Sequence, residues 1–179
     1  MEGGDDPLHF RFSHALVRET LYDGLSGLRR ALNLLQALPH SEERDRHERW
    51  AQARLGVLLG WTRGQGSPEA TRAFARAREL CEAASDSAEE LPALYGLYVA
   101  SLFVPDLDRA LGYAQQLLEA GERHRDPRYS LAGHLAFGMP LFQQGELGAS
   151  LQHSQRATVL ATHWASRGWP TCSRASPGR

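Results

Sequence analysis

Apolar residues recur along most of this chain at intervals of three and four, which places them on one face of a helix. Strict alternation of apolar and polar residues, which is typical of strands, is absent. The connections between the periodic segments are short, so successive helices are expected to run antiparallel. The pattern predicts helices over residues 12–22, 25–38, 42–62, 68–84, 87–103, 107–123, 127–143 and 147–163.

Start and stop signals support these boundaries. Short polar residues that can cap a first turn precede several of the segments, and two of them stand directly before a proline at the first helical position. Glycines that suit a helix exit follow two of the segments. The predicted caps are Ser67, Ser87 (in a capping box with Glu90), Asp106 and Asp126, and the exit glycines are Gly64 and Gly145.

The sequence also repeats with a period of 40 residues, which superimposes the helices in pairs. Small and apolar residues keep the same register in each copy, at spacings that hold them on one face. The sets on the second helix of each pair are Ala70, Ala110 and Ser150; Phe74, Ala114 and Ser154; Ala77, Leu117 and Ala157; and Leu80, Ala120 and Leu160. Those on the first helix are Leu55, Tyr95 and Leu135, and Val57, Leu97 and Phe137.

Such a repeat predicts an all-α fold in which antiparallel helix pairs stack into a right-handed solenoid of about three and a half pairs. A single helix pair cannot bury its apolar face alone, so each pair packs on the next. The alternative is a helical bundle without a repeat, because alanine and leucine are common enough here to match by chance.

The composition of the chain argues against several classes of function. The net charge is −1, so nothing draws the chain to nucleic acid or to an anionic membrane. All 20 basic residues are arginine, which leaves no lysine for a phosphate-binding loop or a Schiff base. Neither a signal peptide nor an apolar run of about 20 residues is present, and the two cysteines form no disulfide framework. We therefore expect a cytoplasmic protein.

The last repeat resembles the tetratricopeptide pattern in residue type, order and spacing. Its period differs from the roughly 34 residues usual in that family, and long first helices would absorb the difference. Pro140 is a second departure and should kink its helix near Gly138. The matching residues are Phe137-Gly138, Leu141-Phe142, Gly145-Glu146-Leu147, Ser150-Leu151 and Ala157.

Residues Phe10 to Tyr22 resemble the F-x-H-x-L-x-R-x-x-x-Y segment that follows the ATPase module of STAND-type signalling ATPases, ahead of their tetratricopeptide arrays. The resemblance implies a sensor or scaffold region of such a bacterial protein, whose output domain is a cyclase or a transcription regulator. The phosphate loop is missing, so a fragment or an internally deleted chain is expected. The domains are then residues 1–9 (disordered), 10–24 (a helical remnant), 25–163 (repeats) and 164–179 (a disordered tail).

The sequence gives little support for a catalytic or metal-binding site. The eight histidines form no HExxH motif and no close cluster with cysteine. His134 and His153 lie on the two helices of one pair and can meet, but a third ligand is lacking, so packing or surface roles are favoured. The charged run from Glu42 to Arg49 predicts a solvated face with i,i+4 ion pairs. Trp61, Tyr95, Tyr98 and Phe103 suit a ligand cage, although at helical spacing core positions are more common.

The sequence therefore predicts a binding module, without catalytic, cofactor or metal residues, whose partner is a protein or a peptide. In tetratricopeptide arrays the first helices line a groove that accepts such a partner. Alternatives are a small-molecule effector sensor with an enclosed pocket at Tyr95, Phe103 or Trp61, and a non-functional truncated fragment. Self-association through the uncapped last pair is also expected, with Leu151, Val159 and Leu160 exposed. The predicted groove residues are Gln52, Thr62, Arg63, Tyr95, Val99, Leu135 and Gln143.

Overall fold

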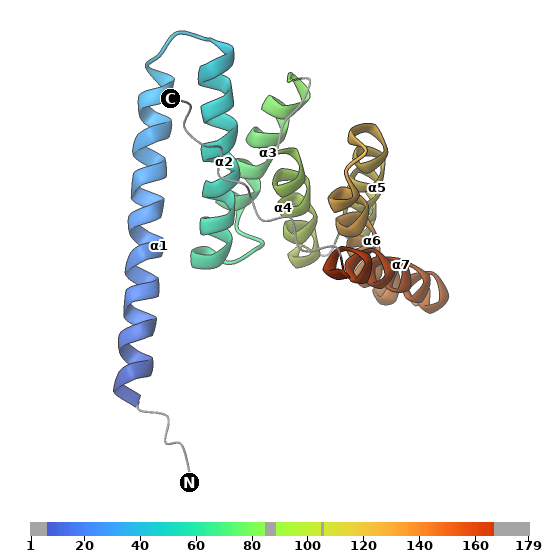
Figure 1. Cartoon of the computed structure of the whole chain (residues 1–179). Coiled ribbons are helices and arrows are strands. Elements are labelled where there is room, and N and C mark those ends of the chain that lie inside the picture. The colour runs from blue at the N-terminus through green and yellow to red at the C-terminus, as the bar shows by residue number, and fades with distance from the viewer. Residues whose placement is uncertain (1–6, 85–88, 105, 167–179) are drawn as a thin grey trace. The chain divides into compact units, whose positions relative to one another are not determined.

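The chain is all-helical wherever the computed structural model describes it, which is over residues 7–84, 89–104 and 106–166, with side chains from residue 19 onward (Figure 1). No strand occurs in these ranges. The helices are α1 (Pro7–Gln36), α2 (Glu42–Arg63), α3 (Pro68–Glu82), α4 (Glu90–Phe103), α5 (Leu107–His124), α6 (Pro127–Gln143) and α7 (Leu147–Ser166).

The helices form two compact units, which divide between Arg109 and Ala110 in the first turn of α5. In the first unit α1 packs on α2, α2 packs on α3 and α4, and α3 packs on α4. In the second unit α6 packs on α7, and α5 comes so close to α6 that a Cβ added at Gly133 would lie 2.6 Å from Leu118 Cδ2. Each unit is therefore built from helices that follow one another along the chain.

The predicted caps and exits are confirmed where the structure describes them. Each capping side chain accepts a hydrogen bond from a backbone N–H of the first turn, and each exit glycine has a positive φ that favours glycine. The caps are Ser67 (3.2 Å to Ala70 N), Asp106 (3.0 Å to Arg109 N) and Asp126 (2.9 Å to Arg128 N), and the φ values are 100° at Gly64 and 84° at Gly145.

The predicted capping box of α4 has only one member inside the described residues. Ser87 lies outside them, and α4 begins at Glu90 after Glu89, which makes no side-chain capping bond. Pro140 is buried within α6, which continues through it to Gln143, and Ser150 of α7 donates its hydroxyl to the Gly138 carbonyl at 2.8 Å. The α6 helix thus continues through its proline, and the Gly138 carbonyl two residues earlier accepts a hydrogen bond from α7.

The prediction of two helices over 12–22 and 25–38 is wrong, because α1 is one continuous helix from Pro7 to Gln36. The presumed break at Gly24 serves packing instead. A Cβ added there would lie 3.1 Å from Leu58 Cδ1 of α2, so glycine allows the two helices to approach closely. Of the Phe10–Tyr22 segment, the side chains up to residue 18 lie outside the described ones. At the other end α7 runs past the expected residue 163 to Ser166.

Phe74 of α3 fixes how α2, α3 and α4 meet. Its ring lies against two glycines on two different helices, Gly56 of α2 and Gly96 of α4. A Cβ added at Gly56 would lie 2.7 Å from the ring, and one added at Gly96 would lie 2.5 Å from it. Phe74 is 3% exposed, so the ring fills the space that the two missing side chains leave. The two glycines are 40 residues apart, the period of the repeat.

The charged run at the start of α2 is only in part the solvated face that its alternating signs predict. Glu42, Glu43, Arg46 and His47 are exposed, and a predicted i,i+4 ion pair joins Arg44 to Glu48. Arg44, Glu48 and Arg49 are buried. Arg44 Nε donates to the Leu35 carbonyl at the end of α1 (2.8 Å), and its Nη2 lies 3.3 Å from Glu48 Oε2. Arg76 of α3 donates through Nε to the other oxygen of Glu48 at 2.8 Å. Buried charges require such partners, and these come from helices that the local pattern of α2 does not reveal.

Candidate partner-binding surface

Helix α6 carries apolar side chains on both of its sides. The residues that it buries are Tyr129, Gly133, Ala136 and Pro140. Its exposed side should be polar in an ordinary surface helix. It instead carries Leu135, Met139 and Phe142 at i, i+4 and i+7, and these three side chains are 52%, 50% and 60% exposed. We call this set the α6 stripe.

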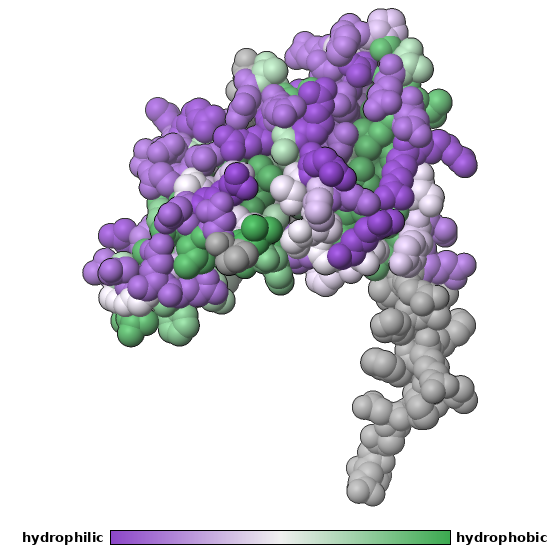
Figure 2. Space-filling view, turned by 180° about the vertical axis from the view of Figure 1, so that it is seen from behind, coloured by the Kyte–Doolittle hydropathy of each residue, from purple (hydrophilic) through white to green (hydrophobic). Residues whose placement is uncertain are grey.

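Helix α4 has a similar set 40 residues earlier. Tyr95 matches Leu135 and is 38% exposed, while Val99 matches Met139 and Leu102 matches Phe142. Val99 and Leu102 are half-buried. The two helices therefore carry apolar residues in the register of the repeat, and Tyr95 is the exposed member of the α4 set. Figure 2 shows hydrophobic side chains reaching the surface in several separate places on the face that it presents.

The predicted groove positions on α2 differ in character from those on α4 and α6. Gln52 and Thr62 are half-buried, and the Thr62 hydroxyl donates to the Leu58 carbonyl at 2.7 Å. Arg63 forms an ion pair with Glu69 at 3.0 Å. Thr62 and Arg63 therefore already have partners within the chain. Gln143, the last residue of α6, is exposed.

The aromatic residues of the first unit divide between core and surface. Tyr98 is buried beside Tyr95, with ring centroids 5.5 Å apart, and burial raises the pKa of Tyr98 to about 12. Its phenol is therefore neutral at physiological pH. The core interpretation is wrong for Trp61 and Phe103, which are 71% and 64% exposed. Side chains so exposed do not enclose a small molecule.

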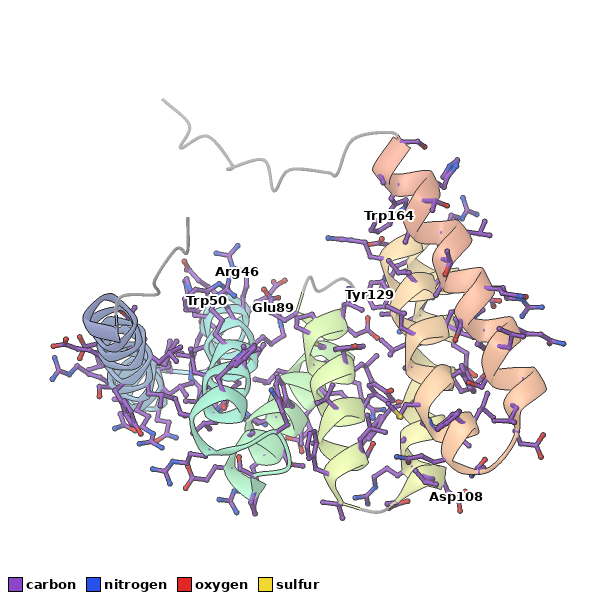
Figure 3. The ribbon with its side chains drawn as sticks, turned by 90° about the horizontal axis from the view of Figure 1, so that it is seen from below. Arg46, Trp50, Glu89, Asp108, Tyr129 and Trp164 are labelled. Atoms are coloured by element: carbon purple, nitrogen blue, oxygen red, sulfur yellow. The ribbon has the colours of Figure 1, made fainter. Side chains whose placement is uncertain are left out.

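A further exposed row on α2 escaped sequence reasoning. Trp50, Val57 and Trp61 lie at i, i+7 and i+11, and all three are exposed. Arg54 completes the row, with its guanidinium 4.5 Å from the centre of the Trp50 ring. Figure 3 shows Trp50 one turn from Arg46 on α2. The i, i+4, i+7 spacing was the available signal, but it also fits a buried face, so spacing alone did not reveal the exposure.

The expected meeting of His134 and His153 is confirmed. Their Nδ1 atoms lie 3.0 Å apart across α6 and α7, and Phe137 lies against the His153 ring at 4.4 Å between centroids. Burial, with Arg156 as a further cause, lowers the pKa of His134; burial, with His134 and Arg156, lowers that of His153. Both imidazoles are therefore neutral at pH 7.

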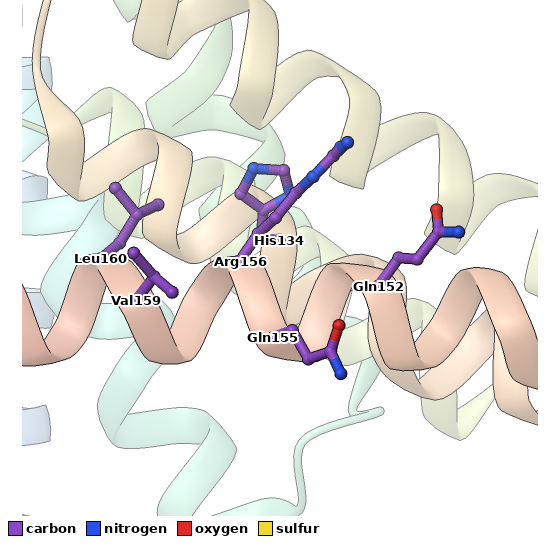
Figure 4. Close-up of a pocket in the computed structure, with 6 residues that line it drawn as sticks. All are labelled: His134, Gln152, Gln155, Arg156, Val159 and Leu160. Atoms are coloured by element: carbon purple, nitrogen blue, oxygen red, sulfur yellow. The ribbon is translucent and has the colours of Figure 1, made fainter.

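An open hollow of about 400 Å³ borders this histidine pair (Figure 4). Polar and charged side chains line one part of it, and apolar side chains of α7 line the rest. A small molecule held there would remain in contact with water, which is unlike an enclosed effector pocket. The lining residues are His134, Gln152, Gln155, Arg156, Val159 and Leu160.

The described residues contain no group of three or more His, Cys, Asp and Glu side chains placed to hold a metal ion. None of the described helices combines the length and apolar character needed to cross a membrane.

Comparison with known proteins found no family model, no curated protein and no solved structure that matches this chain.

Proposed function

We propose that this chain is a tetratricopeptide-like helical-repeat module that binds a protein or peptide partner through the α6 stripe. The observation that carries the proposal is the α6 stripe, a row of exposed apolar side chains on one side of α6. Apolar residues stand at the matching repeat positions of α4, where Tyr95 is exposed and Val99 is half-buried. Exposed apolar side chains in a row lower the solubility of a protein unless they serve an interaction.

The close packing within the first unit supports the repeat part of the proposal. In a stack of helix pairs, the second helix of one pair packs against the first helices of its own pair and of the next pair. Phe74 of α3 lies between Gly56 of α2 and Gly96 of α4 in this manner. We extend the same arrangement to a right-handed stack of all pairs, as in tetratricopeptide proteins.

The chemistry of the α6 stripe indicates the kind of partner. Leu135, Met139 and Phe142 project from a helix at one-turn intervals, which suits the apolar face of an amphipathic helix or an extended peptide with apolar anchors. Methionine adapts to different partner shapes because its side chain is flexible and polarizable. We further propose that the chain acts as the sensor or scaffold part of a STAND-type signalling ATPase, in line with the resemblance of residues 10–22.

A selection experiment tests the binding function. A library of displayed amphipathic peptides is selected against the full chain, and dissociation constants of the selected peptides are measured by calorimetry. The test variant replaces Leu135, Met139 and Phe142 with glutamine. The matched control replaces three exposed apolar residues of α7 with glutamine, namely Leu147, Leu151 and Val159.

Interface anchors commonly contribute 1 to 2 kcal/mol or more each, so the test variant should weaken binding by about tenfold or more. The control variant should bind as the original chain does. Failure to select any peptide of micromolar affinity, or an equal loss of affinity in both variants, would contradict the proposal.

A further inference from the structure

We propose that His134 and His153 form a two-histidine site for a divalent transition-metal ion, with the two Nδ1 atoms as its protein ligands. The ion is of the class that prefers imidazole nitrogen, namely Zn²⁺, Ni²⁺ or Cu²⁺. It would connect α6 to α7 and keep its remaining positions open to water. This inference is independent of the peptide-binding function.

The distance between the two nitrogens carries the proposal. Two imidazole nitrogens that bind one ion at about 2.0–2.1 Å lie about 2.8–3.4 Å apart when the angle at the metal is between about 90° and 110°. The two Nδ1 atoms are 3.0 Å apart. Small rotations of the two rings would therefore let both lone pairs face one ion, without movement of either helix.

The surroundings hold the two rings in place. Phe137, on α6 three residues after His134, stacks against the His153 ring. Ser150, on α7 one turn before His153, donates to the Gly138 carbonyl of α6 at 2.8 Å. These contacts fix α6 and α7 to each other beside the pair. A preformed pair of ligands loses less entropy on binding a metal than two mobile side chains do.

The protonation state also suits a metal. A histidine binds a metal ion only through an unprotonated nitrogen. Without a metal, one Nδ1 must carry a proton to donate to the other, which requires different tautomers on the two rings. Metal binding would move that proton to Nε2 of the same ring, so both Nδ1 atoms become ligands and the site releases no net proton at neutral pH.

Two features set the expected affinity. The site lacks a third His, Cys, Asp or Glu ligand among the described residues, so water or a partner molecule would fill the other positions. Arg156, which lines the adjoining hollow, places a positive charge near the ion and opposes its binding. The site is therefore of moderate affinity. His134 also lines the hollow in Figure 4, through which a carboxylate or phosphate ligand could reach the open positions.

Titration of the full chain with Zn²⁺ and with Ni²⁺ tests the site. Binding is measured by calorimetry at pH 7.5, for the original chain and for three variants. His134→Ala and His153→Ala should each lower the affinity by about tenfold or more, because one imidazole alone is a poor ligand set. His163→Ala is the matched control, since His163 is an exposed histidine of the same helix, and it should bind as the original does.

The variant Arg156→Gln distinguishes a metal site from a histidine pair that only packs α6 against α7, because only a metal site predicts a change in metal affinity. Removal of the Arg156 charge should tighten binding by about threefold, the size expected of one exposed charge nearby. Circular dichroism checks that each variant folds. Where an alanine variant fails to fold, nitrogen NMR of the histidine rings in the original chain replaces it, and the metal should shift the Nδ1 signals of His134 and His153. Equal affinity in either alanine variant and the original, or metal-induced shifts on other histidines alone, would overturn the proposal.

Discussion

Phe74 lies so close to Gly96 that no side chain fits between them. The Cβ of an alanine at Gly96 would lie 2.5 Å from two atoms of the ring, although α3 and α4 are separate helices. Because Phe74 also meets Gly56 of α2, one aromatic ring determines the approach of three helices. The stability of the first unit should therefore depend strongly on residues that have no side chain at all.

Gly96→Ala should destabilise the chain by about 1–3 kcal/mol, the usual cost of forcing an extra carbon into a packed core. Chemical unfolding followed by circular dichroism measures the loss. Gly27→Ala is the control, because a Cβ there meets nothing within 4 Å, and alanine favours a helix interior by roughly 0.5–1 kcal/mol over glycine. If both alanines stabilise the protein, Phe74 is not wedged as described.

Glu48→Gln should lower the free energy of unfolding by about 1.5–3 kcal/mol, the size of a lost hydrogen bond to a charged group. The carboxylate of Glu48 lies between Arg44 and Arg76, and its loss leaves the buried Arg44 guanidinium with Asp45, 3.4 Å away, as its remaining counter-charge. Glu79→Gln removes another carboxylate that pairs with Arg76, but Glu79 is exposed, so its loss should cost less than about 0.5 kcal/mol. Equal effects of the two substitutions in the same unfolding assay would show that the buried network adds nothing.

Acidification should destabilise the second unit through its histidine pair. Burial lowers the pKa values of His134 and His153 in the folded chain, so the unfolded chain binds more protons between its own histidine pKa, about 6.5, and the lower folded values. Stability is then greatest above that range and falls as the pH drops through it.

The slope of stability against pH between pH 7.5 and 5 isolates this contribution. A variant with glutamine at both His134 and His153 should show a shallower slope than the original chain over that interval. The variant His163→Gln should keep the original slope. An unchanged slope in the double variant would assign the pH dependence to other groups.

Asp126 should stabilise α6 chiefly as a cap. Asp126→Ala removes the hydrogen bond to the Arg128 N–H and should cost about 1 kcal/mol, whereas Asp126→Asn keeps an accepting oxygen and should cost less. The bond from the Arg128 side chain lowers the pKa of Asp126, so its charge-dependent contribution is present above pH 4 and disappears as the pH falls through the lowered pKa. Thermal unfolding of the three chains at pH 7 and pH 3 distinguishes these effects.

Local sequence signals predicted most of the helices from residue 42 onward. Caps such as Ser67 and exit glycines such as Gly64 act within one turn, so their meaning can be read without the rest of the fold. The break predicted between residues 22 and 25 is absent because Gly24 lies inside α1, and a glycine inside a helix looks like a glycine after one in sequence. Only the approach of Leu58 from α2 distinguishes them.

Burial was harder to predict than helicity. Arg44 and Glu48 have the alternating charges of a solvated helix, yet their partners Leu35 and Arg76 come from α1 and α3. The α6 stripe and Trp61 have the spacing of a core face, yet they are exposed. Periodicity gives the faces of a helix, but which face another element covers depends on tertiary packing that one sequence does not display.

The glycines around Phe74 also determine which helix pairs can be exchanged. Where the first pair has Phe74, the later pairs have Ala114 and Ser154, and the α6 position matching Gly56 and Gly96 is Ala136, which is fully buried. A large ring suits only neighbours that lack side chains, so the pairs are not interchangeable modules. Deletion of the α4–α5 pair, which would put α6 where α4 now stands, would place the Phe74 ring against the Ala136 methyl group. Recombination within this chain is therefore restricted to breakpoints that keep Phe74 together with both of its glycines.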